Sequence, residues 1–190
     1  MERLERFAGL LLAENQRQNL ISKASEAHLW QRHIADSVQL LAHVSRETMA
    51  DDKIWLDLGT GAGFPGLVIA ALHPDMRVVL VEARARRADF LAASAERLGL
   101  RRCEVLADRL ERITPFIANV ISARAFAPLE KLLRLSAPFS TKSTCYLLPK
   151  GRSAAHELEA LKPSIRTMFH VKQSLTDRAA GIIVSKVSRD

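Results

Sequence analysis

The sequence has few cysteines, few aromatic residues and no long apolar segment. Its two cysteines, Cys103 and Cys145, stand in apolar runs typical of strands, and they are too few for a disulfide framework or a CxxC metal pair. We expect buried free thiols and no metal site. No run of about 18 apolar residues occurs, which argues against a membrane span, and the N-terminal segment lacks the apolar block of a signal peptide. We therefore expect a cytoplasmic monomer that does not bind membranes.

Basic residues outnumber acidic ones. The 190 residues include 28 Lys and Arg against 21 Asp and Glu, a formal charge of +7 to which arginine contributes most. A basic surface attracts polyanions, and arginine binds phosphate in a forked geometry. Nucleic acid is therefore a candidate partner, although charge alone does not decide the matter.

Glycine is scarce, yet half of it is concentrated in one place. Four of the eight glycines, Gly59, Gly61, Gly63 and Gly66, lie within eight positions between two apolar runs. Glycine weakens local structure, so this concentration needs a reason. A strand at 54–58, a glycine loop and a helix at 65–74 would form a cradle of bare main chain against which a ligand can lie.

Strands and helices alternate along the rest of the chain. Residues 1–48 are expected to be helical, and later helices are expected at 84–98, 128–139 and 154–161. Further strands are expected at 77–83, 103–108, 118–125, 144–151, 165–175 and 181–188. This alternation predicts an α/β fold, with a mostly parallel seven-stranded sheet and helices on both faces. We divide the chain into an N-terminal helical extension, 1–50, and one compact domain, 51–190.

The predicted topology collects polar loops at one edge of the sheet. Right-handed crossovers place the carboxyl ends of parallel strands at the same edge, and ligands bind outside those ends. The loops expected there are 59–64, 82–84, 108–111, 122–126 and 149–152.

Two nucleotide cofactors fit the glycine loop. A dinucleotide would be bound through GxGxxG, which Gly61, Gly63 and Gly66 satisfy, but that motif alone is weak evidence. S-adenosylmethionine would be bound through an acidic residue followed by GxGxG, which Asp57 and Gly59 begin. A carboxylate beside the loop suits the ammonium group of the methionine end and would repel a pyrophosphate.

Each acidic residue near the loop has two interpretations. Glu82 ends the second strand, where its carboxylate can accept hydrogen bonds from ribose hydroxyls in either cofactor. The structural alternatives are that Asp57 caps the N–H groups of the loop, and that Glu82 pairs with Arg84 or Arg86.

Several motifs occur together in a fixed order. They are "NLIS", "RHIADSV", "WLDLGTGAGFPGLVIA", "LVEARARRADFL", "RLE", "ISARAFAPL" and "LLPKG", and they cover about residues 15–151. In this combination the chain resembles the bacterial small-subunit ribosomal RNA guanine-N7 methyltransferases, the glucose-inhibited division protein B family. One departure is Ala123, which stands before Arg124 where the family more often has serine. The last 40 residues match weakly.

The resemblance implies a Rossmann-like class I methyltransferase that uses S-adenosylmethionine. Its substrate would be N7 of one guanine of 16S ribosomal RNA near the decoding centre, on free RNA or the small subunit. The resemblance places cofactor contacts at Gly59, Phe64, Leu110, Glu111 and Arg124. Phe64 and Leu110 would pack on apolar parts of the ligand, although Leu110 could equally be a core residue.

The implied chemistry needs no general base. Guanine N7 has an exposed lone pair and no proton to lose, so we assign no catalytic residue and expect catalysis by alignment and exclusion of water. For the substrate, Arg124 and Lys150 are candidates to hold RNA phosphate or the guanine edge, and Arg124 could instead hold the cofactor. Arg84, Arg86 and Arg152 are further candidates, in a basic rim that would include Arg87, Arg101 and Arg102.

Three other functions stay open at this point. The glycine loop is compatible with a dinucleotide-dependent oxidoreductase. The chain could also be a non-catalytic ribosome-assembly factor that retains the fold, or a methyltransferase of small molecules, which would not need a basic rim. Arg32 and Asp36, four residues apart, are expected to pair with each other on a helix that docks on the domain.

Overall fold

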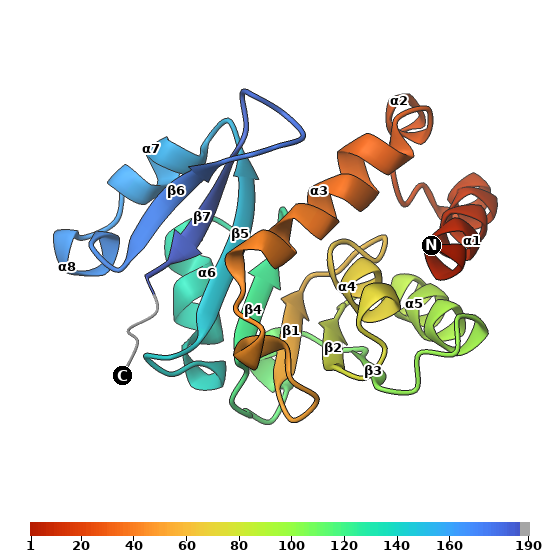
Figure 1. The fold of residues 1–190 in the computed structure, drawn as a ribbon, viewed down its shortest axis with the longest axis horizontal. Coiled ribbons are helices and arrows are strands. Elements are labelled where there is room, and N and C mark those ends of the chain that lie inside the picture. The colour runs from red at the N-terminus through yellow and green to blue at the C-terminus, as the bar shows by residue number, and fades with distance from the viewer. Residues whose placement is uncertain (187–190) are drawn as a thin grey trace.

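A computed structural model describes residues 1–186 of the chain. Its seven strands form one sheet in the order β3-β2-β1-β4-β5-β7-β6 (Figure 1). They are β1 (Ile54–Leu58), β2 (Arg77–Val81), β3 (Cys103–Leu106), β4 (Val120–Ala123), β5 (Cys145–Gly151), β6 (Phe169–Gln173) and β7 (Gly181–Ser185). Only β7 runs against its neighbours, β5 and β6. The predicted mostly parallel seven-stranded sheet is confirmed.

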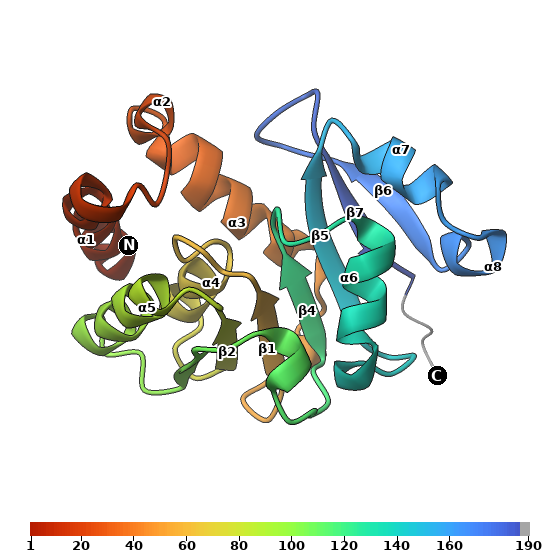
Figure 2. The ribbon, with the colours of Figure 1, turned by 180° about the vertical axis from the view of Figure 1, so that it is seen from behind.

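Helices cover both faces of this sheet. On one face lie α1 (Glu2–Gln18), α4 (Gly66–Leu72), α5 (Ala85–Arg97) and a helical segment, residues 30–43; on the other lie α6 (Leu129–Ser136) and α7 (Ala154–Glu159) (Figures 1 and 2). The helical segment consists of η1 (Trp30–Ala35), α3 (Asp36–Val38) and η2 (Gln39–His43). Shorter helices are α2 (Lys23–Glu26), η3 (Glu47–Met49), η4 (Leu110–Arg112), η5 (Ala137–Phe139) and α8 (Pro163–Arg166).

Alternate residues of each central strand face opposite cores. In β1, Trp55 packs with α4 and α5, whereas Leu56 and Leu58 pack with α6 and α7. All three side chains are fully buried. Strands buried on both faces need near-continuous apolar sequences, which is why the parallel strands were recognisable from the sequence.

The closing strands differ from the prediction. The expected strand at 165–175 begins instead with the end of α8, and β6 is confined to Phe169–Gln173. Pro163 at the first position of α8 favours this helical turn. Of the expected strand at 181–188, β7 covers Gly181–Ser185, and residues 187 and 188 lie outside the described part of the chain.

The N-terminal extension shares its core with the sheet. Phe7 and Leu11 of α1 are fully buried in the same cluster as Trp55 and Leu67. The predicted boundary at residue 50 falls between η3 and β1, and the division into a helical extension and one compact domain stays a prediction.

Gly66 offers a direct test of this packing. A Cβ at Gly66 would collide with Leu80 Cδ2 and lie 2.8 Å from Asp57 Oδ2, so we expect Gly66→Ala to destabilise the protein by about 1–3 kcal/mol. Gly9 on α1 is exposed, with no atom within 4 Å of such a Cβ, so Gly9→Ala should stabilise by up to about 1 kcal/mol. Urea denaturation of both variants checks the prediction, and a neutral Gly66→Ala would contradict it.

Candidate cofactor and substrate site

The glycine loop lies where the strand order reverses, between β1 and β4. Gly59, Gly61 and Gly63 have φ values of 64°, 61° and 102°, a region that residues with a Cβ rarely adopt. The amide of Thr60 donates to Val81 O at 3.1 Å, which ties the loop to the end of β2. Backbone conformation therefore requires glycine at these three positions whatever the loop binds.

Protein side chains explain part of the glycine concentration. A Cβ at Gly63 would lie 2.8 Å from Phe7 Cζ, and one at Gly59 would lie 2.7 Å from Phe126 Cδ2. Gly61 is different, because the nearest atoms to its Cβ position are Gly59 O at 3.7 Å and Arg87 Nη1 at 3.8 Å. Close approach of protein atoms thus accounts for Gly63, while the face of Gly61 is open to a ligand.

Asp57 is at the centre of a buried hydrogen-bond network. Its side chain is fully buried, accepts from the Gly66 amide at 3.0 Å and accepts from Ser122 Oγ at 2.6 Å. Ser122 Oγ in turn accepts from Trp55 Nε1 at 2.8 Å. Burial raises the pKa of Asp57 to about 6, against the opposing effect of the hydrogen bonds from Ser122, Thr60 and Gly66. This geometry favours the structural alternative, in which Asp57 holds the loop and the start of α4.

Glu82 holds the loop from the neighbouring strand. Its carboxylate accepts from the Gly61 amide at 2.9 Å and from the Arg84 amide at 2.9 Å. It therefore bonds the backbone of Arg84, and within residues 1–186 no ion pair joins it to Arg84 or Arg86. The acid predicted for ribose hydroxyls lies directly beside the open face of Gly61.

The loop after β3 brings the other expected cofactor residues to the same edge. Leu110 and Glu111 lie on η4, where the Leu110 side chain is buried in the core and Glu111 is exposed. The core alternative for Leu110 fits this placement, because only 2% of the residue is exposed.

Arg124 extends from the end of β4 across the site. Its guanidinium lies 5.1 Å from the centroid of the Phe64 ring, 3.7 Å from Asp36 Oδ2, and donates to Arg32 O at 3.4 Å. The predicted pairing of Arg32 with Asp36 is thus replaced by an ion pair that reaches from the helical segment to β4. Asp36 Oδ1 also accepts from Thr176 Oγ1 at 2.7 Å, which attaches the β6–β7 loop to the same carboxylate.

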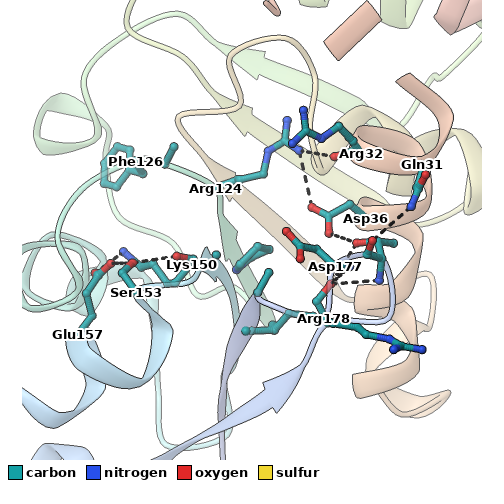
Figure 3. A pocket seen from close by; sticks show the side chains of 18 of the residues that line it. Gln31, Arg32, Asp36, Arg124, Phe126, Lys150, Ser153, Glu157, Asp177 and Arg178 are labelled. Carbon is teal, nitrogen blue, oxygen red and sulfur yellow. Dashed lines mark hydrogen bonds and ion pairs between the residues drawn. The ribbon is translucent and has the colours of Figure 1, made fainter. Parts of the chain in front are cut away.

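A large cleft opens beside Arg124. It has a volume of about 1410 Å³ and lies between the helical segment, the β4–α6 loop, the end of β5 and the β6–β7 loop (Figure 3). Within residues 1–186, the lysine and arginine residues that line it are Arg32, Arg124, Lys150 and Arg178, and the acidic ones are Asp36, Glu157 and Asp177. The glycine loop does not line this cleft, but Phe126, which packs on Gly59, does.

Lys150 is already engaged within the protein. Its ammonium donates to Ala127 O at 2.7 Å and lies 2.9 Å from Glu157 Oε2, with only 6% of the side chain exposed. Glu157 also accepts from the Leu129 amide at 3.1 Å. Lys150 and Glu157 therefore clamp the β4–α6 loop at its α6 end, and a contact between Lys150 and RNA would require these bonds to break. Arg152, by contrast, is exposed.

The predicted basic rim does not form one surface. Arg102 donates to Asp51 O at 2.7 Å, which places it and Arg101 at the amino edge of the sheet, before β1 and β3. The prediction that these two arginines surround the site is wrong, because the α5–β3 turn lies at the edge opposite to the loops. Arg84 and Arg86 are exposed at the start of α5, and Arg86 borders a smaller hollow beside α1.

Sequence reasoning missed the contribution of the helical segment. His33 stacks on Phe64, with ring centroids 5.0 Å apart and an angle of 18° between the planes. The motif "RHIADSV" pointed to this segment, but spacing alone could not show that His33 and Asp36 face the residues after β1 and β4.

The described residues offer neither a metal site nor a membrane-spanning helix. Among residues 1–186, no three His, Cys, Asp or Glu side chains gather in a way that could hold a metal ion, and no helix has the length and apolarity to cross a membrane. Cys145 is a buried free thiol as predicted, whereas Cys103 is only partly buried.

The fold is that of class I S-adenosylmethionine-dependent methyltransferases. Among solved structures, an RNA methyltransferase from Salinibacter ruber in complex with S-adenosyl-L-homocysteine has a TM-score of 0.60 and 13% identity, over 81% of this chain and 91% of that one. The mitomycin 7-O-methyltransferase MmcR has a TM-score of 0.61 and 14% identity, over 98% of this chain and 67% of that one.

Sequence comparison identifies the family. The chain belongs to the GidB family, whose model, described as rRNA small subunit methyltransferase G, matches residues 1–181. Proteins named ribosomal RNA small subunit methyltransferase G from Erythrobacter litoralis and Novosphingobium aromaticivorans are both 55% identical to it, over 98% of this chain and over 88% and 80% of theirs. The predicted family and fold class are confirmed, and the dinucleotide-dependent oxidoreductase is excluded.

The raised pKa of Asp57 predicts an unusual pH dependence of stability. With a pKa of about 6 in the folded state and an ordinary value of 3.8, the folded chain binds this proton more tightly, so stability falls as pH rises from about 4 to 6. We expect the free energy of unfolding to fall by up to about 3 kcal/mol in total, with about 1 kcal/mol of this fall between pH 5 and 7. Asp57→Asn cannot titrate, and equal pH slopes for it and the unsubstituted chain in urea denaturation would contradict the prediction.

Because Lys150 clamps the loop, replacing it should destabilise the protein, whereas replacing the nearby Arg152 should not. Lys150→Met leaves Ala127 O without its side-chain donor and Glu157 without its ion-pair partner, so we expect the free energy of unfolding to fall by about 1–3 kcal/mol. Arg152→Gln, two residues away on an exposed side chain, should change it by less than about 0.5 kcal/mol. Equal effects of the two substitutions in urea denaturation would refute the clamp.

Proposed function

We propose that this protein transfers a methyl group from S-adenosylmethionine to N7 of one guanine of 16S ribosomal RNA near the decoding centre. The observation that carries the proposal is the match of residues 1–181 to the rRNA small subunit methyltransferase G family. The RNA would be free or part of the small subunit, the enzyme cytoplasmic and monomeric. These finer points are our inference from the family and from the chemistry of the site.

In this proposal the cofactor lies along the carboxyl edge, across the loops after β1, β2 and β3. The open face of Gly61, which a Cβ would fill, fits close approach of a ligand to the main chain. Glu82 beside it would accept hydrogen bonds from the ribose, with Leu110 and Glu111 near the adenine. Gly59 and Gly63 would set the course of the loop, and Asp57 would hold it rather than contact the ligand.

The other end of the cofactor would reach the residues after β1 and β4. The sheet order puts β2 and β3 on one side of β1, and β4 on the other. With the ribose at Glu82, the methionine end therefore extends toward Phe64 and Arg124. This placement favours a cofactor role for Arg124 over an RNA role.

Alignment is the main contribution of the chain to the chemistry. When bound, S-adenosylmethionine would supply an electrophilic methyl group and leave as S-adenosylhomocysteine, and guanine N7 offers a lone pair that carries no proton. The protein therefore needs to orient the guanine and exclude water, and oriented reactions gain roughly 7–11 kcal/mol in this way. No side chain has to act as a general base.

The cleft beside Arg124 is the proposed entrance for the target nucleotide. At about 1410 Å³ it is larger than ordinary small-molecule pockets, and a flipped-out base with flanking phosphates would use that room. Arg32 and Arg178 are its arginines at the surface, and they would contact phosphate. Arg84, Arg86 and Arg152 remain candidates for outer RNA contacts, which would weaken as salt increases.

Mapping methylated guanine tests the proposal. Small-subunit RNA from cells lacking this protein should lack one N7-methylguanine, and the purified protein with S-adenosylmethionine should restore it. Calorimetry should show binding of S-adenosylhomocysteine and none of NADH. RNA with every methyl group in place would instead point to a small-molecule substrate, and absence of S-adenosylhomocysteine binding would point to an assembly factor without catalysis.

A further inference from the structure

His33 carries two buried polar atoms that the protein itself does not satisfy. Within residues 1–186, neither Nδ1 nor Nε2 of its ring has a hydrogen-bond partner, and both atoms are inaccessible to solvent. Buried polar atoms are nearly always hydrogen-bonded, because an unpaired one costs about 1–3 kcal/mol. A histidine in this position therefore indicates a bond that forms in another state of the protein.

The backbone around His33 is also unusual. His33 lies in η1, a π-helix of six residues, Trp30–Ala35. Such π-helical turns are rare and frequently occur at functional sites. The turn directs the imidazole onto the Phe64 ring at the end of the glycine loop, and the Arg124 guanidinium lies 5.1 Å from the centroid of that same ring. Two independent features thus direct this side chain to the cofactor site.

We propose that His33 and Arg124 together bind the carboxylate of the methyl donor's methionine end. The proposal rests on the function proposed above, which places that end of the donor beside Phe64. Arg124 supplies the positive charge; its ion-pair partner Asp36 Oδ2 is 3.7 Å away, beyond hydrogen-bond distance, and its bond to Arg32 O is long, at 3.4 Å. His33 supplies an N–H donor without adding a second charge.

The protonation state of His33 is consistent with this role. Burial lowers its pKa to about 4, and the nearby charges of Arg124 and Arg32 act in the same direction. The imidazole is therefore neutral near pH 7, with one donor and one acceptor nitrogen. A neutral donor can lie beside Arg124 without repulsion, and an entering carboxylate would compete with Asp36 for the Arg124 guanidinium.

Two changes test the proposal: a donor that lacks the methionine carboxylate, and a variant that lacks the His33 ring nitrogens. His33→Phe keeps the stack on Phe64 but has no hydrogen-bonding atoms. By calorimetry we expect it to bind S-adenosylmethionine roughly 10- to 100-fold more weakly, the loss of one hydrogen bond to a charged group. Decarboxylated S-adenosylmethionine, which lacks only the carboxylate, should bind both proteins within about threefold of each other.

Two further variants separate this role from a structural one. His33→Gln retains an N–H donor and should recover part of the affinity. His156→Phe, the same substitution at an exposed histidine of α7 outside the described lining of the cleft, should bind the donor like the unsubstituted chain. Because His33→Phe removes two unpaired buried atoms, its melting temperature without ligand should be equal to or above that of the unsubstituted chain.

Specific results would overturn the proposal. Unchanged affinity of His33→Phe for S-adenosylmethionine would do so, and so would an equal loss of affinity for the decarboxylated donor, because the ring would then act through packing alone. Failure of the unsubstituted chain to bind either donor would instead overturn the proposed function, and the two failures are therefore distinguishable.

Discussion

The buried carboxylate of Asp57 is the interaction on which the site depends. It joins three elements at the point where the strand order reverses, because it comes from β1, accepts from Ser122 of β4 and accepts from the first amide of α4. A carboxylate with no exposed surface is costly to keep charged, as its raised pKa shows. The hydrogen bonds from Ser122 and Gly66 offset that cost, and they fix the glycine loop and the end of β4 relative to each other.

Two further side chains fix the loops on either side of Asp57. Glu82 fixes the loop from β2 through the Gly61 amide, and Lys150 fixes the β4–α6 loop through Ala127 O. Between these fixed points Phe126 packs on Gly59, at the boundary between the glycine loop and the cleft. Asp57, Glu82 and Lys150 looked like ligand contacts in the sequence. In the structure they bond the main chain of the loops that a ligand would contact.

The sequence predicted the sheet well and the roles of its polar residues less well. Strand positions followed from apolar runs such as "IWLDL", and the loops at the carboxyl edge followed from topology alone. Whether Asp57 binds a ligand or caps the loop could not be decided, because both roles require the same residue type at the same position. The arginines were harder still, since Arg102 and Arg124 look alike in sequence but lie at opposite edges of the sheet.

The N-terminal helices are part of the site rather than an attachment to it. Phe7 fills the space that glycine leaves at position 63, and Asp36 bonds both Arg124 and the β6–β7 loop. These contacts link residues at the two ends of the chain through one carboxylate, so the cleft has no complete wall without the helical segment. A compositional boundary near residue 50 therefore separates two patterns of secondary structure, while the functional unit extends across it. Because the contacts are between residues more than 50 positions apart, no local pattern in the sequence could have revealed them.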